Sequence, residues 1–238
     1  MSLRRRVEPE WLDTLPPDEP RARRARRDLR RINRLMSTRR LVGPALDVLV
    51  RTSSAASPIP VIELGSGDGE LLLYLGRRYA SHWPRMDVTL LDLQPVVRTR
   101  TMDGYRALGW SVQVVRSDVL AWLAEPDANP KPIILANLFV HHFAGERLRA
   151  VLEGAARHAS AFLCCEPRRS RFALQSSRML GAIGCNDVTR HDAVASVRAG
   201  FSASELSSLW PRPNEWSLQE GPAGWFSHRF CARRKRDA

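Results

Sequence analysis

The stretch that decides the fold is Glu63-Leu64-Gly65-Ser66-Gly67-Asp68-Gly69, a glycine-rich turn between two regular segments. The apolar run over 59–64 predicts a short strand before it, and 70–79 predicts a helix after it. Glycines at alternate positions permit a tight turn in which a ligand can approach the backbone closely. In open α/β sheets, ligands bind at the carboxyl ends of strands, near the point where the strand order switches. The stretch therefore predicts a ligand-binding turn after the first strand of a Rossmann-like sheet.

Strands and helices continue to alternate after this turn. Helices are predicted at 95–108 and 147–158, and strands at 86–91, 112–115, 133–138 and 161–165. Continuous apolar runs are typical of a parallel sheet that helices cover on both faces. Residues 216–220 and 225–231 flank a Gly-Pro-Ala-Gly turn and predict an antiparallel hairpin. The expected fold class is α/β, a Rossmann-like doubly wound, mostly parallel seven-stranded sheet closed by this C-terminal hairpin.

The first 57 residues have a different composition. Residues 1–20 are rich in proline and acids and predict an extended arm, whereas 21–40 carry ten arginines and one acid. Among these arginines, apolar residues at spacings of three and four form one face of a helix: Ala22, Ala25, Leu29, Ile32 and Met36. A second helix is predicted at 42–50. We divide the chain at a linker over 52–58 into an N-terminal cap, 1–57, and a ligand-binding domain, 58–238, with a lid around 167–210.

The overall composition limits the classes of function. A chain of 238 residues with 44% hydrophobic content suits one globular domain with an added arm. The four cysteines lack the spacing of zinc ligands, so we predict neither a disulfide nor a metal site. With no secretory signal and no membrane-length apolar run, a cytoplasmic protein is expected. The net charge of +12 is compatible with nucleic acid, an anionic membrane or an acidic ligand, and equally with an arginine-rich composition.

Acidic residues at the strand ends favour a cationic ligand with a ribose. The glycine pattern is GxGxG rather than the GxGxxG of dinucleotide sites, and carboxylates flank it. Asp92 ends the second strand, where a carboxylate can accept both ribose hydroxyls. Asp118 ends the third strand, where it or its neighbours can reach an adenine. For both aspartates, capping of the following helix is the alternative interpretation.

Together with the run Asn137-Leu138-Phe139-Val140-His141-His142-Phe143, these motifs resemble class I S-adenosylmethionine (SAM)-dependent methyltransferases over residues 59–231. The resemblance implies SAM as the cofactor. Glu63, Gly65 and Gly67 would line its methionine end, and Asp92 would hold the ribose. The cofactor-binding residues that it implies are Glu63, Gly65, Ser66, Gly67, Asp92, Leu93, Asp118, Val119 and Asn137.

A narrower resemblance concerns the methyl acceptor. The arm Pro9-Glu10-Trp11-Leu12 and the stretches 166–170 and 184–194 resemble bacterial small-molecule methyltransferases associated with type III polyketide synthases and phenolic-lipid pathways. This implies methyl transfer to a phenolic hydroxyl, which benefits from a general base with a pKa near neutrality. The catalytic candidates are His141, His142, His191 and Glu166. Asp187 or Asp192 could orient the imidazole of His191.

Other functions remain open from the sequence. The net charge and the arginine-rich helix suggest an RNA methyltransferase, although no RNA-binding module is recognisable. A NAD-dependent dehydrogenase is disfavoured by the GxGxG spacing and by the presence of only two lysines, Lys131 and Lys235. A non-catalytic SAM-binding protein would keep the same glycine turn. The basic helix could contact an anionic membrane or clamp an anionic acceptor. The acceptor, the methylated atom and the oligomeric state do not follow from the sequence.

Overall fold

A computed structural model describes residues 3–53, 57–126 and 129–235, so that 54–56 of the predicted linker lie outside the described residues. The strands form one sheet in the order β3-β2-β1-β4-β5-β7-β6. They are β1 (Ile59–Leu64), β2 (Met86–Asp92), β3 (Ser111–Arg116), β4 (Ile133–Asn137), β5 (Ala161–Pro167), β6 (Trp216–Ala223) and β7 (Ser227–Arg234). The first five strands pair in parallel, and β7 runs antiparallel to both β5 and β6. The predicted fold class is confirmed.

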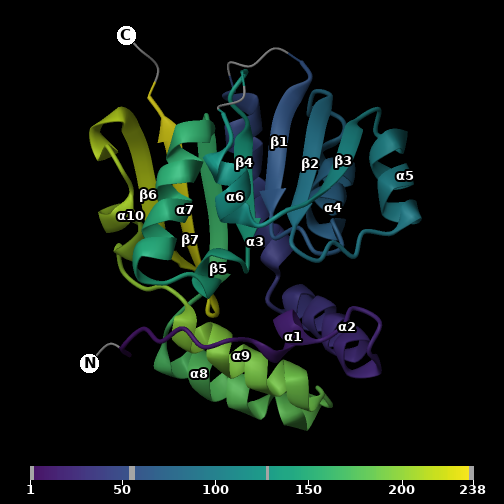
Figure 1. Ribbon diagram of the computed structural model, residues 1–238, viewed down its shortest axis with the longest axis vertical. Coiled ribbons are helices and arrows are strands. Elements are labelled where there is room, and N and C mark those ends of the chain that lie inside the picture. The colour runs from purple at the N-terminus through teal and green to yellow at the C-terminus, as the bar shows by residue number, and fades with distance from the viewer. Residues whose placement is uncertain (1–2, 54–56, 127–128, 236–238) are drawn as a thin grey trace.

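Helices cover both faces of this sheet and bury one apolar core on each (Figure 1). One core joins the sheet to α6 (Val119–Ala124), α7 (Gly145–His158) and α10 (Glu205–Leu209). The other joins it to α3 (Thr38–Arg51), α4 (Glu70–Tyr79) and α5 (Thr99–Ala107). β1, β4 and β5 are buried along nearly their whole length, which explains their continuous apolar runs.

A further layer of helices faces the carboxyl ends of the parallel strands (Figure 1). It consists of the single turn α1 (Trp11–Thr14), α2 (Pro20–Leu35), α8 (Arg171–Arg178) and α9 (Asp187–Ala199). Three short 3-10 turns complete the structure: η1 (Val140–His142), η2 (Met179–Ile183) and η3 (Pro213–Glu215). The N-terminal arm runs along α9, so residues from both ends of the sequence meet in this layer. None of the described helices is long and apolar enough to cross a membrane.

The N-terminal helices differ in detail from the predicted ones. The basic helix predicted to 40 ends at Leu35, and Ser37 has a left-handed φ of 56° between α2 and α3. α3 begins at Thr38, before the start predicted at 42, and it contains Gly43. A Cβ at Gly43 would lie 2.9 Å from the hydroxyl oxygen of Tyr79, so glycine lets α3 pack closely on α4. This packing between helices is a tertiary effect that local patterns do not reveal.

Candidate functional site

A cavity of about 520 Å³ lies at the carboxyl ends of β1, β2 and β4, beneath α2. Its volume is typical of small-molecule sites. β1 has β2 on one side and β4 on the other, so the cavity sits at the switch in strand order. It is lined by all nine residues predicted to bind a cofactor: Glu63, Gly65, Ser66, Gly67, Asp92, Leu93, Asp118, Val119 and Asn137.

The glycine turn is tied to the end of β2 by Asp92. One carboxylate oxygen of Asp92 accepts a hydrogen bond from the backbone N–H of Gly67, and the other accepts one from Gln94, both at 2.8 Å. Gly67 has a φ of +53°, and nothing lies within 4 Å of the place where a Cβ would stand. The backbone of this turn is therefore open to a ligand. Gly65 serves packing, because a Cβ there would lie 2.3 Å from the ring of Phe139.

Glu63 places a buried carboxyl group against this cavity. Burial, together with the charges of Asp68 and Asp92, raises the pKa of Glu63 to about 8. Within the described residues its Oε2 has no hydrogen-bond partner, and the same is true of three other buried oxygens in the cavity wall: Asn33 Oδ1, Ser66 Oγ and Asn137 Oδ1. Buried polar atoms without partners are rare in native proteins. These four groups are therefore arranged to bind a polar ligand.

The charge of the cavity is opposite to that of the whole protein. Its wall contains six carboxylates and three guanidinium groups, although the chain has a net charge of +12. The excess of carboxylates attracts cations and repels a diphosphate. SAM carries a sulfonium and an ammonium group, and its ribose offers hydroxyl donors to Asp92. The donor and acceptor groups of the cavity fit SAM better than a dinucleotide.

Two of the predicted cofactor-binding residues, Asp118 and Leu93, have a second role or an unusual exposure. The Asp118 carboxylate accepts hydrogen bonds from the backbone N–H groups of Leu120 and Ala121, at 2.8 and 3.2 Å, so it caps α6. It borders the cavity at the same time. Leu93, next to Asp92, exposes 60% of its surface, which leaves an apolar side chain at the cavity mouth. An aromatic ring can pack on such a side chain.

Of the four catalytic candidates, only His142 lines the cavity. Its Nδ1 lies 3.2 Å from the carboxylate of Asp13 in the arm. His141 is buried behind it, with Nδ1 2.7 Å from Glu166 and Nε2 3.3 Å from Glu10. Burial by itself lowers the pKa of His141, but the hydrogen bonds to Glu10 and Glu166 outweigh burial and raise the pKa to about 9.

The geometry gives Glu166 and His191 positions outside the cavity. The wholly buried Glu166 carboxylate accepts hydrogen bonds from the backbone N–H groups of Phe139, Val140 and His141, so it holds the η1 turn. His191 lies on α9, where its ring stacks on Trp11 at 4.0 Å and its Nδ1 lies 2.8 Å from Asp192. Neither side chain belongs to the cavity wall. Their role as bases stays a prediction.

Sequence reasoning missed the part of the cavity wall that the N-terminal segment supplies. The arm contributes Glu10, Leu12 and Asp13, and α2 contributes Arg26, Leu29, Arg30 and Asn33. Arg30 pairs with Asp68 of the glycine turn at 3.3 Å, which fixes α2 over the cavity. The only local signal was the apolar stripe of α2, which includes Leu29.

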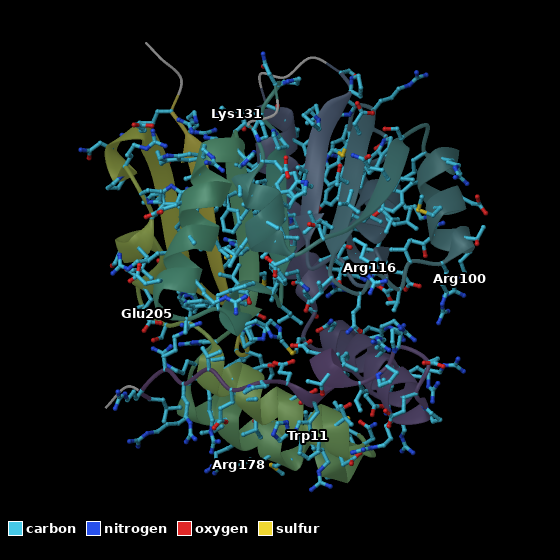
Figure 2. All side chains as sticks on the ribbon, viewed as in Figure 1. Trp11, Arg100, Arg116, Lys131, Arg178 and Glu205 are labelled. Atoms are coloured by element: carbon cyan, nitrogen blue, oxygen red, sulfur yellow. The ribbon has the colours of Figure 1, made fainter. Side chains whose placement is uncertain are left out.

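The segment 167–210, predicted as a lid, anchors the arm instead of lining the cavity. The Asp192 carboxylate on α9 accepts hydrogen bonds from the backbone N–H groups of Trp11 and Leu12, at 2.8 and 3.0 Å. On α2, Asp28 accepts one from the backbone N–H of Asn186 at 2.9 Å. Figure 2 shows Trp11 beside α9 in the layer below the sheet. No residue of 167–210 that the structure describes belongs to the cavity wall.

A second cleft, of about 940 Å³, lies at the opposite end of the sheet, near Lys131 (Figure 2). Its described lining contains none of the predicted site residues. The strand ends that bind ligands in α/β sheets point away from it. The cavity beneath α2 is therefore the candidate site.

Comparisons with known proteins agree with this fold. Residues 61–161 match the family model described as a methyltransferase domain, and no curated protein matches the sequence. The solved structure of the plantazolicin methyltransferase BpumL in complex with S-adenosylhomocysteine (SAH) superposes with a TM-score of 0.63 at 14% identity, covering 92% of each chain.

Two further solved structures have the same fold at low sequence identity. One comes from work on the conversion of a disulfide bond into a thioacetal group during echinomycin biosynthesis (TM-score 0.55, 20% identity, 82% of this chain and 83% of that one). The other is an O-methyltransferase family protein from Burkholderia thailandensis (TM-score 0.53, 19% identity, 93% of this chain and 65% of that one). The chain therefore has the Rossmann-like fold of methyltransferases, and its central segment matches the methyltransferase domain.

Proposed function

We propose that this protein transfers a methyl group from SAM to a small-molecule acceptor, and that the acceptor atom is a phenolic hydroxyl oxygen. The observation that carries the proposal is the buried Glu63 carboxyl in a cavity rich in carboxylates. A buried acid without a hydrogen-bond partner at one oxygen is costly unless a ligand compensates it. The positive groups of SAM supply that compensation.

Different residues of the cavity wall would contact the methionine end, the ribose and the adenine of SAM. Glu63 and the glycine turn would hold the methionine end, and Asp92 would hold the ribose. Each carboxylate oxygen of Asp92 uses one lone pair for a backbone N–H, which leaves acceptor capacity for the two ribose hydroxyls. Leu93 and Val119 would contact the adenine.

Part of the remaining wall is apolar and supports an aromatic acceptor. It presents Phe139 and Phe143 from the segment after β4, and Leu12 and Leu29 from the N-terminal cap. His142 lies among these side chains and is the catalytic candidate that can contact an acceptor. Among the structures with this fold are BpumL complexes with SAH and desmethyl plantazolicin analogues, so the fold accommodates natural-product acceptors.

In this reaction the protein would contribute mainly by aligning the methyl donor with the acceptor. SAM, held by Glu63, Asp92 and the glycine turn, would supply its methyl group to the acceptor oxygen, and the hydroxyl proton would pass to His142 or to water. Holding the two reactants in line can supply a large part of the rate enhancement. The arm and α2, which close the cavity, would exclude water and fix that alignment.

Calorimetric titration with SAH, with NAD as the parallel control, tests the cofactor. Micromolar binding of SAH without binding of NAD is the expected result. Binding of NAD alone, or of neither ligand by the folded protein, would contradict the proposal. With SAH binding established, transfer of a labelled methyl group from SAM to alkylated phenols tests the acceptor. Labelling of bulk RNA but not of phenols would favour the RNA methyltransferase instead.

A further inference from the structure

Three side chains with metal-binding atoms meet at the acceptor side of the cavity. Glu10 comes from the N-terminal arm, and His141 and His142 come from η1. One ligand atom from each residue lies within 4.8 Å of the other two. Glu10 and His142 line the cavity, while His141 is buried behind them. The cluster is therefore buried on the His141 side and open to the cavity on the side of Glu10 and His142.

The contacts of His141 create a position for a cation. Its Nδ1 lies 2.7 Å from Glu166, whose carboxylate is already fixed by backbone N–H groups. An imidazole that donates its Nδ1–H to Glu166 turns the lone pair of Nε2 toward Glu10, whose Oε1 is 3.3 Å away. A lone pair and a carboxylate at this distance repel, so a proton joins them in the metal-free protein, and a metal ion could take the place of that proton.

The distance also suits a metal ion. Two ligands that each lie about 2.0–2.1 Å from a tetrahedral zinc ion are separated by roughly 3.3–3.4 Å. The Glu10 and His141 atoms already have this separation. His142 then needs only a side-chain adjustment at the cavity wall to complete the set.

Each ligand has an outer partner of the kind that supports metal sites. Metal-bound histidines usually donate their other ring N–H to a carboxylate or carbonyl. His141 has Glu166 in this role, and His142 has Asp13 at 3.2 Å. The hydroxyl of Ser196 on α9 donates a hydrogen bond to Glu10.

We propose that Glu10, His141 and His142 bind a divalent transition-metal ion of the zinc type, with an open coordination position toward the cavity. Two imidazoles and one carboxylate favour zinc and its neighbours over Mg²⁺, which prefers oxygen ligands. Three protein ligands with one open position are typical of catalytic rather than structural zinc sites. An acceptor oxygen bound at that position would have a lowered pKa and would release its proton to water. This catalytic consequence rests on the proposed function, whereas metal binding does not.

The test is calorimetric titration of chelator-treated protein with Zn²⁺, with Mg²⁺ as the comparison, and visible spectroscopy of the Co²⁺-loaded protein. Glu10→Gln and His142→Asn each remove one ligand with little change in size. His82→Asn is the matched control, because His82 also pairs with a carboxylate but lies far from the cavity, near Asp47. Circular dichroism and SAH titration of each variant show whether it is folded.

We expect one Zn²⁺ per chain and no comparable Mg²⁺ binding. Both ligand variants, but not His82→Asn, should lose at least roughly 10- to 100-fold in zinc affinity, because removing even an outer partner of a ligand typically costs that much. The Co²⁺ spectrum should change in the same two variants. No zinc binding by the wild-type protein, or equal binding by folded Glu10→Gln and wild type, would overturn the site. SAH binding without zinc binding would overturn the metal site and leave the proposed function in place. Zinc binding without SAH binding would support the metal site and contradict the proposed function.

Discussion

At the scale of single residues, Glu63 is the group on which cofactor binding should depend most. Replacement by glutamine keeps the shape but removes a carboxyl group that can ionise when the positively charged cofactor binds. We expect Glu63→Gln to weaken SAM binding by about 1.5–3 kcal/mol, the contribution of a hydrogen bond to a charged group. Calorimetry measures this loss. The control is Glu70→Gln at the start of α4, because Glu70 pairs with Arg100 outside the cavity wall.

Glu63 should also make the stability of the ligand-free protein depend on pH. Its folded-state pKa of about 8 lies above the value of about 4.3 expected in the unfolded chain. The folded protein then binds the extra proton, so this contribution to stability is complete below the unfolded pKa and is lost as pH rises through 8. Urea unfolding at pH 5 and pH 9 should show wild type losing stability relative to Glu63→Gln. If the difference in unfolding free energy between wild type and Glu63→Gln is the same at both pH values, the pKa of Glu63 is not raised.

Two of the predicted catalytic histidines, His142 and His191, should behave differently when each is replaced by alanine. His142→Ala is expected to lower turnover at least tenfold while SAH affinity stays within about twofold, because His142 faces the acceptor side. His191→Ala should leave the chemistry intact and loosen the arm, since its ring stacks on Trp11. Steady-state kinetics with SAH titration separates the two outcomes. Equal loss of turnover in both variants would argue against our assignment of His142.

At the scale of elements, α9 holds the arm that closes the cavity. Asp192 accepts hydrogen bonds from two backbone N–H groups at the start of α1, and Asp192→Ala leaves both unpaired. We expect the arm to open more easily, by about 1–3 kcal/mol, with little change in the rest of the fold. Hydrogen exchange at Trp11 and Leu12 measures this opening.

A second aspartate on the same helix provides the control. Asp187 pairs with Arg21 of α2 at the surface, where both side chains are about half exposed. Such exposed ion pairs contribute little to stability, typically about 1 kcal/mol or less. Asp187→Ala should therefore leave exchange in the arm nearly unchanged. Rapid exchange in both variants would indicate that α2, rather than Asp192, fixes the arm.

At the scale of the whole molecule, the cavity joins the glycine turn, three strand ends and the N-terminal cap. A ligand that binds only when these parts are assembled stabilises the folded state. SAH at a concentration of 100 times its Kd should add about 2.7 kcal/mol and raise the Tm by roughly 5–10 °C. Differential scanning calorimetry measures the shift. NAD at the same concentration should produce none.

Local sequence patterns were enough to predict the sheet and the cofactor half of the site. The motif over 63–69 follows a buried strand, and Asp92, Asp118 and Asn137 come at or directly after the ends of the next three strands. Parallel strands place their carboxyl ends at one edge of the sheet, so local patterns suffice to bring these residues together. All nine predicted cofactor residues accordingly lie in one cavity. Helix ends were less predictable, because α2 ends at Leu35, before the left-handed Ser37, rather than where its charge pattern ends.

Only the tertiary structure decided which residues complete the acceptor side. Glu10 meets His141 across 131 residues of sequence, and Trp11 meets Asp192 across 181. No periodicity or local motif records such contacts, because they depend on how the arm docks on α9 after the sheet has formed. The same docking explains why His191, a catalytic candidate in the sequence, stacks on Trp11 of the arm. Glu166, another candidate, holds the η1 turn through backbone hydrogen bonds. It also brings together two imidazoles and a carboxylate, although the cysteine pattern had predicted no metal site.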